Sequence, residues 1–123
     1  MSVKVLVIDD SLMVRQQVGR ALTGAGFVAI DACDGRDALL KLAETPDIRL
    51  AICDVTMPVM NGLEFLEHLR ADGHALPVVM LTTEGQPELI QKAKALGAKG
   101  WIVKPFKPEQ LVAVAKKQTA AAA

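Results

Sequence analysis

Five short apolar runs alternate with five segments of helical periodicity, and this alternation constrains the fold of the chain more than any other feature. The apolar runs are residues 3–8, 27–32, 50–53, 77–82 and 100–103. Apolar residues recur at helical spacing in residues 12–22, 34–43, 61–69, 87–96 and 108–115. Strands that alternate with helices predict a parallel sheet covered on both faces. Right-handed crossovers then favour a doubly wound α/β fold with five strands and five helices.

Composition and charge limit the kinds of protein that this chain can be. Its 123 residues fit one domain with a real core, and 51% of them are hydrophobic, which argues against disorder. Fourteen basic residues balance fourteen acidic ones, so no net field would attract nucleic acid or an anionic membrane. No apolar run approaches the ~20 residues that span a bilayer, and the N-terminus lacks a signal peptide. We therefore expect one cytoplasmic domain over residues 1–123, without nucleic-acid or membrane partners.

Polar side chains that can bind ligands or take part in chemistry follow four of the five predicted strands. The first strand ends in Asp9-Asp10, the third in Asp54, the fourth in Thr82-Thr83-Glu84 and the fifth in Lys104. In open parallel sheets, ligands bind beyond the carboxyl ends of the strands, where the strand order reverses. If the first and third strands are neighbours, ~4.8 Å apart, their three aspartates converge at that point.

The chemistry of this group of side chains favours a metal and a phosphoryl group. Three carboxylates so close together repel one another and resist ionisation. Mg²⁺ suits a site with a few carboxylates, several waters and a phosphate oxygen. Lys104 would add a point charge and Thr82 a hydrogen bond, which completes the parts needed to neutralise a phosphoryl group. The pattern predicts that Asp54 is the nucleophile that accepts this group.

The motifs are those of a known family. They are the acidic pair Asp9-Asp10, the segment Asp54-Val55-Thr56-Met57-Pro58 followed by Asn61-Gly62, then Thr82, and Lys104-Pro105-Phe106. With these motifs in order, the whole chain resembles the receiver domain of two-component response regulators, most closely the single-domain chemotaxis type, CheY-like. The resemblance implies a flavodoxin-like fold with the strand order 2-1-3-4-5.

The same resemblance implies how the acidic residues divide their roles. Asp54 would take a phosphoryl group from the phosphohistidine of a histidine kinase or phosphotransfer protein. Asp10 and Asp54 would bind Mg²⁺ directly, with the backbone carbonyl of Thr56 as a further ligand. Asp9 would help to bind the ion, partly through water.

Binding of the phosphoryl group and output involve the last two strands in the family. By this resemblance, Thr82 and Lys104 would bind the phosphoryl oxygens, and the Lys104–Pro105 peptide bond would be cis. Thr82 would then turn toward the phosphoryl group while Trp101, where relatives carry Tyr or Phe, moves inward. This movement would change the affinity of the last strand and the last two helices for an unnamed protein target.

We therefore expect a signalling switch and not a metabolic enzyme. Its only catalysis would be assisted phosphorylation of Asp54 and slow hydrolysis of the acyl phosphate. Many chemotaxis-type relatives carry Asn two places after the acceptor, so Thr56 is expected to alter the lifetime of the phosphorylated state. Because no output domain follows the last helix, we expect the chain to act by binding a partner. We also expect it to be a monomer.

Three other functions remain open on the residues alone. A Mg²⁺-dependent phosphatase with an aspartate nucleophile would carry a second Asp where this chain has Thr56, and would add a cap domain. A flavin-binding module would suffer repulsion between Asp9-Asp10 and the flavin phosphate. A receiver that docks without phosphorylation would not need the intact set of site residues. Taken alone, the acidic pair could also simply cap a helix, and Lys104 could be a solvated loop residue.

The remaining cysteines and histidines are expected to be structural or exposed. Cys33 and Cys53 would lie on strands separated by a third, about 9–10 Å apart, which is too far for a disulfide. We expect both to be buried small hydrophobic residues. His68 and His74 are expected at the surface, far from the strand ends.

Overall fold

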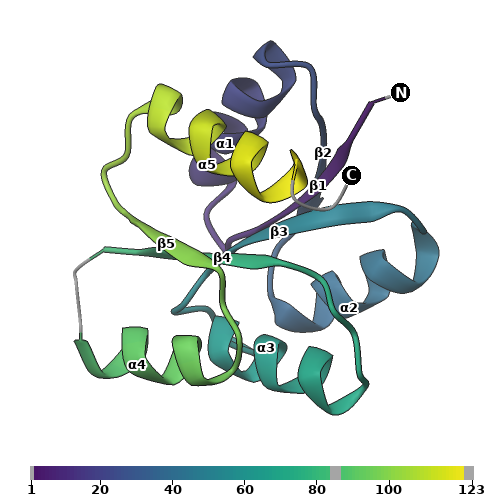
Figure 1. The fold of residues 1–123 in the computed structure, drawn as a ribbon, viewed down its shortest axis with the longest axis vertical. Coiled ribbons are helices and arrows are strands. Elements are labelled where there is room, and N and C mark those ends of the chain that lie inside the picture. Colours follow the sequence, from purple (N-terminus) through teal and green to yellow (C-terminus); the bar gives the residue numbers. More distant parts are fainter. Residues whose placement is uncertain (1, 84–86, 121–123) are drawn as a thin grey trace.

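The computed structural model describes residues 2–83 and 87–120, in which all ten predicted elements are found (Figure 1). The strands are β1 (Lys4–Ile8), β2 (Val28–Ala32), β3 (Ile48–Asp54), β4 (Val78–Thr82) and β5 (Gly100–Val103). The helices are α1 (Leu12–Gly24), α2 (Gly35–Glu44), α3 (Gly62–Ala71), α4 (Pro87–Ala95) and α5 (Pro108–Ala120). All strand pairs are parallel, in the order β2-β1-β3-β4-β5, which confirms the predicted fold class and strand order.

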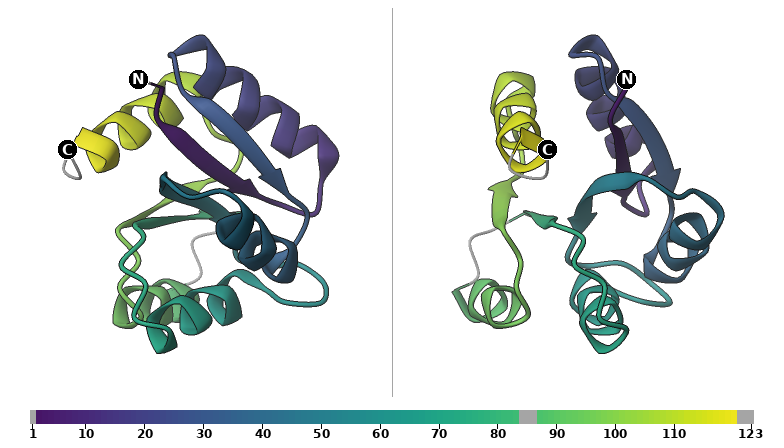
Figure 2. Two further views of the ribbon diagram at one scale, coloured as in Figure 1. Left: turned by 90° about the vertical axis from the view of Figure 1, so that its right-hand side faces the viewer. Right: turned by 45° about the vertical axis from the view of Figure 1, so that its right-hand side comes forward.

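Helices cover both faces of the sheet, as Figures 1 and 2 show. Helices α1 and α5 lie on one side, whereas α2, α3 and α4 lie on the other. The strand β1 shows why: Val5 and Val7 belong to the core under α1 and α5, while Leu6 and Ile8 belong to the core on the opposite face. Successive side chains of a strand point to opposite faces, so a strand buried on both sides must be apolar throughout.

The pairing register brings the strand ends to one edge of the sheet. Ile8 on β1 pairs with Cys53 on β3, so Asp9 and Asp54 each come one residue later on adjacent strands. Farther along the sheet, toward β5, Thr82 on β4 pairs with Val103 on β5, directly before Lys104. The prediction that the reactive side chains follow neighbouring strands is therefore confirmed.

A close approach at Gly62 sets where α3 begins relative to β3. The Gly62 N–H donates to the carbonyl of Val55 at 2.9 Å. A Cβ at this position would collide with the backbone carbonyl oxygen of Asp54 and lie 3.0 Å from the Cα of Val55. Only glycine lets the first turn of α3 pass this close to the strand end that carries Asp54. Asn61 and Glu64 then form a reciprocal capping box that starts the helix.

The prediction for the cysteines is right for one and wrong for the other. Both thiols are free, and Cys53 is buried in the core. Cys33, however, is exposed, because it follows Ala32, the last residue of β2, and so lies outside the sheet. Its backbone N–H donates to the Asp37 carboxylate at 3.0 Å. His68 and His74 are exposed, as expected.

Within residues 2–83 and 87–120, none of the helices has the length and apolar character needed to cross a bilayer.

Candidate functional site

Three aspartates form an acidic cluster at the carboxyl edge of the sheet. One carboxylate oxygen from each of Asp9, Asp10 and Asp54 lies within 4.8 Å of the other two. Asp9 is completely buried and Asp54 is only 7% exposed, whereas Asp10 is exposed. The cluster therefore combines two carboxylates with little access to water and a third that faces the solvent.

Lys104 provides the positive charge that the two buried aspartates need. Its Nζ lies 2.9 Å from Oδ2 of Asp9 and 3.4 Å from Oδ2 of Asp54. The backbone N–H of Lys104 donates to the carbonyl of Thr82 at 2.6 Å, which ties the ends of β4 and β5 together. The Lys104–Pro105 peptide bond is cis, as predicted. Lys104 is thus held in the site and is not a solvated loop residue.

The electrostatics of the cluster are only partly balanced. Burial, and next to it the negative charge of Asp9, raise the pKa of Asp54, while Lys104 acts in the opposite direction. Burial also disfavours the Lys104 ammonium, but its hydrogen bond to Asp9 and the charges of both aspartates outweigh this, so the pKa of Lys104 is raised. The ionised Asp54 is therefore less stable in this site than in water, and a further cation would relieve it.

Local hydrogen bonds hold Asp9 in place. Its backbone N–H donates to the carbonyl of Ala32 at 3.1 Å, and its Oδ1 accepts the N–H of Ser11 at 2.9 Å. Ser11 is the N-cap of α1, and its Oγ accepts the N–H of Val14 at 3.3 Å. The first of the three aspartates is therefore fixed both to the neighbouring strand and to the start of the helix.

Thr82 carries a buried hydroxyl without a partner among the described residues. The residue is 6% exposed, and its Oγ1 is buried and makes no hydrogen bond with any of them. Buried hydroxyls are nearly always paired, and this one, at the edge of the site, is available to hydrogen-bond a ligand. Thr83 is exposed, and Glu84 lies outside the described residues.

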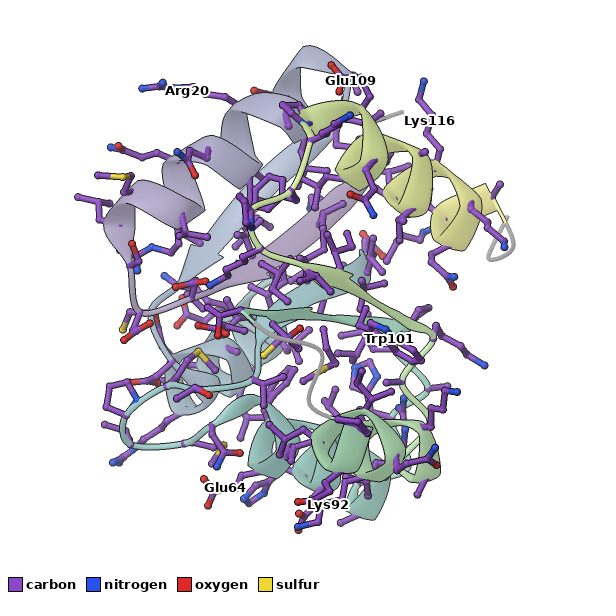
Figure 3. All side chains as sticks on the ribbon, turned by 90° about the vertical axis from the view of Figure 1, so that its left-hand side faces the viewer. Arg20, Glu64, Lys92, Trp101, Glu109 and Lys116 are labelled. Atoms are coloured by element: carbon purple, nitrogen blue, oxygen red, sulfur yellow. The ribbon has the colours of Figure 1, made fainter. Side chains whose placement is uncertain are left out.

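Trp101 lies on the opposite side of the sheet from α5. It packs against the core cluster on the α2, α3 and α4 side and is half-buried, with its ring toward α4 in Figure 3. The Nζ of Lys94 lies 4.9 Å from the centre of its ring, a distance typical of a cation–π contact. Nothing in the sequence indicated this pair, because it joins a helix to the following strand across a turn.

The donor set fits Mg²⁺. Oxygen ligands lie about 2.1 Å from this ion, so opposite ligands are about 4.2 Å apart. One carboxylate oxygen from each of the three aspartates lies within 4.8 Å of the other two, so the three can face a single ion of this kind. The surplus of carboxylates over cations and the orphaned hydroxyl of Thr82 are consistent with a site that takes a cation together with an anion.

An apolar groove of about 810 Å³ opens beside the cluster. Val14 and Ala21 line it from α1, and Phe106 and Pro108 line it from the segment that follows β5. Lys104 also contributes to its wall, so the groove adjoins the acidic cluster.

Arg15 also contacts the site and Asp31 pairs with Arg15, and neither residue was predicted to take part. Arg15 donates to the backbone carbonyl of Asp9 at 2.6 Å and is paired with Asp31 on β2 at 3.3 Å. The only sequence signal was the position of Arg15 on the first turn after the Ser11 cap, which does not identify its partners. Thr56, predicted to offer a backbone carbonyl, is exposed, and its N–H donates to Oδ1 of Asp54 at 3.4 Å.

With this arrangement in view, the class of protein is clear: residues 5–116 match the response regulator receiver domain family, and the chain belongs to it. The chemotaxis protein CheY of Treponema pallidum is 43% identical over 105 residues, which cover 84% of this chain and 73% of that protein. CheY of Thermotoga maritima is 34% identical over 119 residues, 95% of this chain and 98% of that protein.

Solved structures agree with the sequence relatives. The structure of chemotaxis protein CheY4 from Vibrio cholerae is 43% identical and superimposes with a TM-score of 0.89, covering 96% of this chain and 99% of that one. The chain is therefore a receiver domain of the CheY type, a class of phosphorylation-dependent signalling switches and not of metabolic enzymes. Receiver domains bind Mg²⁺ at an acidic pocket, and Asp9, Asp10 and Asp54 make up such a pocket here.

Proposed function

We propose that Asp54 accepts a phosphoryl group from a phosphohistidine and that this modification switches the affinity of the chain for a protein target. One observation carries the proposal. The acidic cluster, Lys104 and the orphaned hydroxyl of Thr82 lie at the same edge of the sheet, and together they suit a divalent cation and a phosphoryl group. The rigid end of β3 holds the proposed nucleophile in place.

The transfer needs an in-line approach to phosphorus. A carboxylate oxygen of Asp54 forms the new bond to phosphorus, and the bond from phosphorus to the histidine nitrogen breaks, leaving its electron pair on that nitrogen. Negative charge spreads over the phosphoryl oxygens, so positive groups nearby lower the barrier. Lys104 already lies 3.4 Å from the Asp54 carboxylate and supplies such a charge to one of these oxygens. The hydroxyl of Thr82 donates a hydrogen bond to another.

Bound Mg²⁺ would supply charge neutralisation for the phosphoryl oxygens and would orient them. Asp10 and Asp54 would hold it directly with the backbone carbonyl of Thr56, and Asp9 would take part through water. In the resting state Lys104 partly fills the same electrostatic role by pairing with Asp9 and Asp54.

The donor is proposed to approach over the apolar groove beside the site. A helix of a kinase or phosphotransfer domain that carries a phosphohistidine needs an apolar surface to pack on. The groove provides one next to Lys104, with Val14 and Phe106 on its two walls. On the output side, we propose that Thr82 turns toward the phosphoryl group and that Trp101 moves inward, which alters the face made by α4, β5 and α5. Phosphorylation shifts this equilibrium only if the phosphoryl group binds one arrangement better than the other.

Labelling with a small phosphodonor tests the proposal. Wild-type protein incubated with labelled acetyl phosphate and Mg²⁺ is expected to gain one acid-stable, base-labile phosphoryl group. Asp54→Asn should remain unlabelled and should lose most of its Mg²⁺ affinity, whereas Asp72→Asn, an exposed acid at the end of α3, should behave like wild type. Wild-type labelling of Asp54→Asn would refute the assignment.

Several predictions stay predictions. These are the extent of the domain over residues 1–123, the monomeric and cytoplasmic state, and the identity of kinase and target. The phosphatase and flavin alternatives gain no support from the site. Thr56 stands where the phosphatase needs its second acid, and the negative charges of Asp9 and Asp10 in the acidic cluster would repel a flavin phosphate.

A further inference from the structure

Arg15 forms a bridge between β2 and the loop that carries the acidic pair. Its Nη1 donates to the backbone carbonyl of Asp9 at 2.6 Å, and its Nε pairs with Oδ2 of Asp31 at 3.3 Å. The Arg15 side chain is 15% exposed and that of Asp31 is 51% exposed, so the arginine is largely covered while its partner faces solvent. An arginine whose charge is mostly buried must be well paired, and these two contacts provide that pairing.

The contact of Arg15 bears on the acidic cluster because the group that accepts its hydrogen bond is the backbone carbonyl of Asp9. The carbonyl of Asp9 belongs to the peptide unit that joins Asp9 to Asp10. Because that unit is planar, fixing its oxygen fixes the orientation of the Asp10 N–H and restricts the backbone from which the Asp10 side chain projects. Asp10 is the exposed member of the cluster, and no hydrogen bond to its side chain is found in the described structure. Its direction therefore depends on its backbone.

Strand β2 supplies the anchor. Asp31 pairs with Val7 across β1–β2, two residues before Asp9, so its carboxylate stands close to the end of β1. It holds the guanidinium by its Nε and leaves Nη1 directed at the peptide. Strand β2, which contributes no residue to the acidic cluster, thus supports the cluster through Arg15.

We infer that Arg15, held by Asp31, is a positioning residue that orients the Asp9–Asp10 peptide so that Asp10 faces the divalent cation. The inference rests on the proposed function, because it concerns the same cation site. Residues that orient metal ligands from behind commonly change metal affinity by 10–100-fold when substituted.

The charge of Arg15 and its proposed positioning role predict opposite changes in Mg²⁺ affinity when Arg15 is replaced, which makes the inference testable. Arg15 is a cation near a cation site, so its charge alone repels Mg²⁺, and removing it should strengthen binding. Loss of positioning should weaken binding instead. A weaker site after removal of a nearby positive charge therefore has no simple electrostatic explanation.

The experiment is a titration of the full chain with MgCl₂, followed by the backbone amide NMR signals of residues 9–11 and 54–56. Arg15→Gln is expected to raise the Mg²⁺ dissociation constant about tenfold. The double variant Arg15→Gln/Asp31→Asn keeps the net charge and is expected to show the same rise. Arg20→Gln removes the same charge from the same helix at an exposed position on the wall of the apolar groove, and it should stay within twofold of wild type.

Two further measurements separate the possible failures. Urea unfolding in EDTA reports whether Arg15→Gln has lost its fold. If it has, Arg15→Lys, which keeps the charge but cannot hold both acceptors, is titrated in its place and should still bind Mg²⁺ several-fold more weakly. Wild-type or tighter Mg²⁺ binding by a folded Arg15 variant overturns the inference and leaves the proposed function intact. If wild type itself binds no Mg²⁺ at these amides, the proposed cation site fails, and the inference fails with it.

Discussion

Replacing Asp54 by Asn is expected to stabilise the metal-free protein while abolishing its phosphorylation. The substitution keeps the size of the side chain and removes one buried negative charge. Because burial and Asp9 raise the pKa of Asp54, the ionised carboxylate opposes folding. The introduced amide would not carry this charge, and it would still offer a carbonyl oxygen to the N–H of Thr56.

The contacts of Asp54 set the size of the effect. Its Oδ2 lies 3.4 Å from Lys104 Nζ, and its Oδ1 accepts one hydrogen bond from Thr56 at 3.4 Å. Both distances exceed the roughly 2.7–2.9 Å of strong charge-assisted bonds. A buried polar group left unpaired costs about 1–3 kcal/mol and a charged one more, and the Lys104 pair offsets most of this cost for Asp54. After substitution Lys104 keeps its 2.9 Å bond to Asp9. We therefore expect a gain of about 1 kcal/mol in the free energy of unfolding, or roughly 4 °C in Tm.

The assay is urea unfolding at pH 7.5 in EDTA, followed by far-UV circular dichroism and by the emission of Trp101, the single tryptophan. Glu67→Gln, which removes an exposed charge from α3, is the control and should change stability little. With Mg²⁺ at tenfold its dissociation constant, wild type should gain about 1.4 kcal/mol. Asp54→Asn should gain little, so wild type, the less stable protein in EDTA, should become the more stable one in Mg²⁺.

The pH dependence follows from the direction of the shift. A carboxyl whose pKa is raised in the folded state destabilises the fold once it ionises, and this penalty vanishes as it becomes protonated in both states. The advantage of Asp54→Asn should be full near pH 7. It should shrink as the pH falls through the raised pKa toward the ordinary value of 3.8. A variant less stable than wild type in EDTA at pH 7.5, or an advantage that grows on acidification, would refute the reasoning.

Three further substitutions test other parts of the site. Lys104→Arg should still bind Mg²⁺ in an NMR titration, but beryllofluoride should no longer change the emission of Trp101, because a planar guanidinium does not replace a compact ammonium. A response of the emission equal to that of wild type would contradict this role. Thr56→Asn should alter the decay rate of the phosphorylated protein more than its formation rate from acetyl phosphate; equal fractional changes would count against its placement near the attacking water. Thr82→Ala removes a buried, unpaired hydroxyl, so it should leave resting stability nearly unchanged while strongly reducing the beryllofluoride response of Trp101. Thr83→Ala, on an exposed neighbour, should keep the full response.

The sequence predicted the elements and the chemistry of the strand ends because both depend on local pattern. The apolar runs are too short for helices, and the reactive residues directly follow them. The order of the strands could not be predicted in this way, because periodicity does not show that β3 pairs with β1. That order came from the family resemblance. The convergence of Asp9 with Lys104, which are 95 residues apart, depends on this order.

What the sequence did not reveal depends on tertiary geometry. The contact of Arg15 with the Asp9 carbonyl depends on the angle at which α1 crosses the sheet, which no spacing encodes. Cys33 was expected in the core because it adjoins an apolar run, but it lies one position beyond the end of β2 and is exposed. The pairing of Lys94 with Trp101 likewise depends on how α4 lies over β5.

Lys104 shows how the proposed metal and phosphoryl functions depend on each other. In the resting structure its ammonium compensates Asp9 at 2.9 Å and Asp54 at 3.4 Å, so it is the counter-ion of the acidic cluster. To bind a phosphoryl oxygen, it must weaken at least one of these pairs, and a buried carboxylate left unpaired is costly. A divalent cation among the three aspartates removes that cost, because it replaces the charge that Lys104 withdraws. On the proposed mechanism, cation binding therefore favours the release of Lys104 for the incoming phosphoryl group, which gives a physical reason for phosphorylation to depend on the metal.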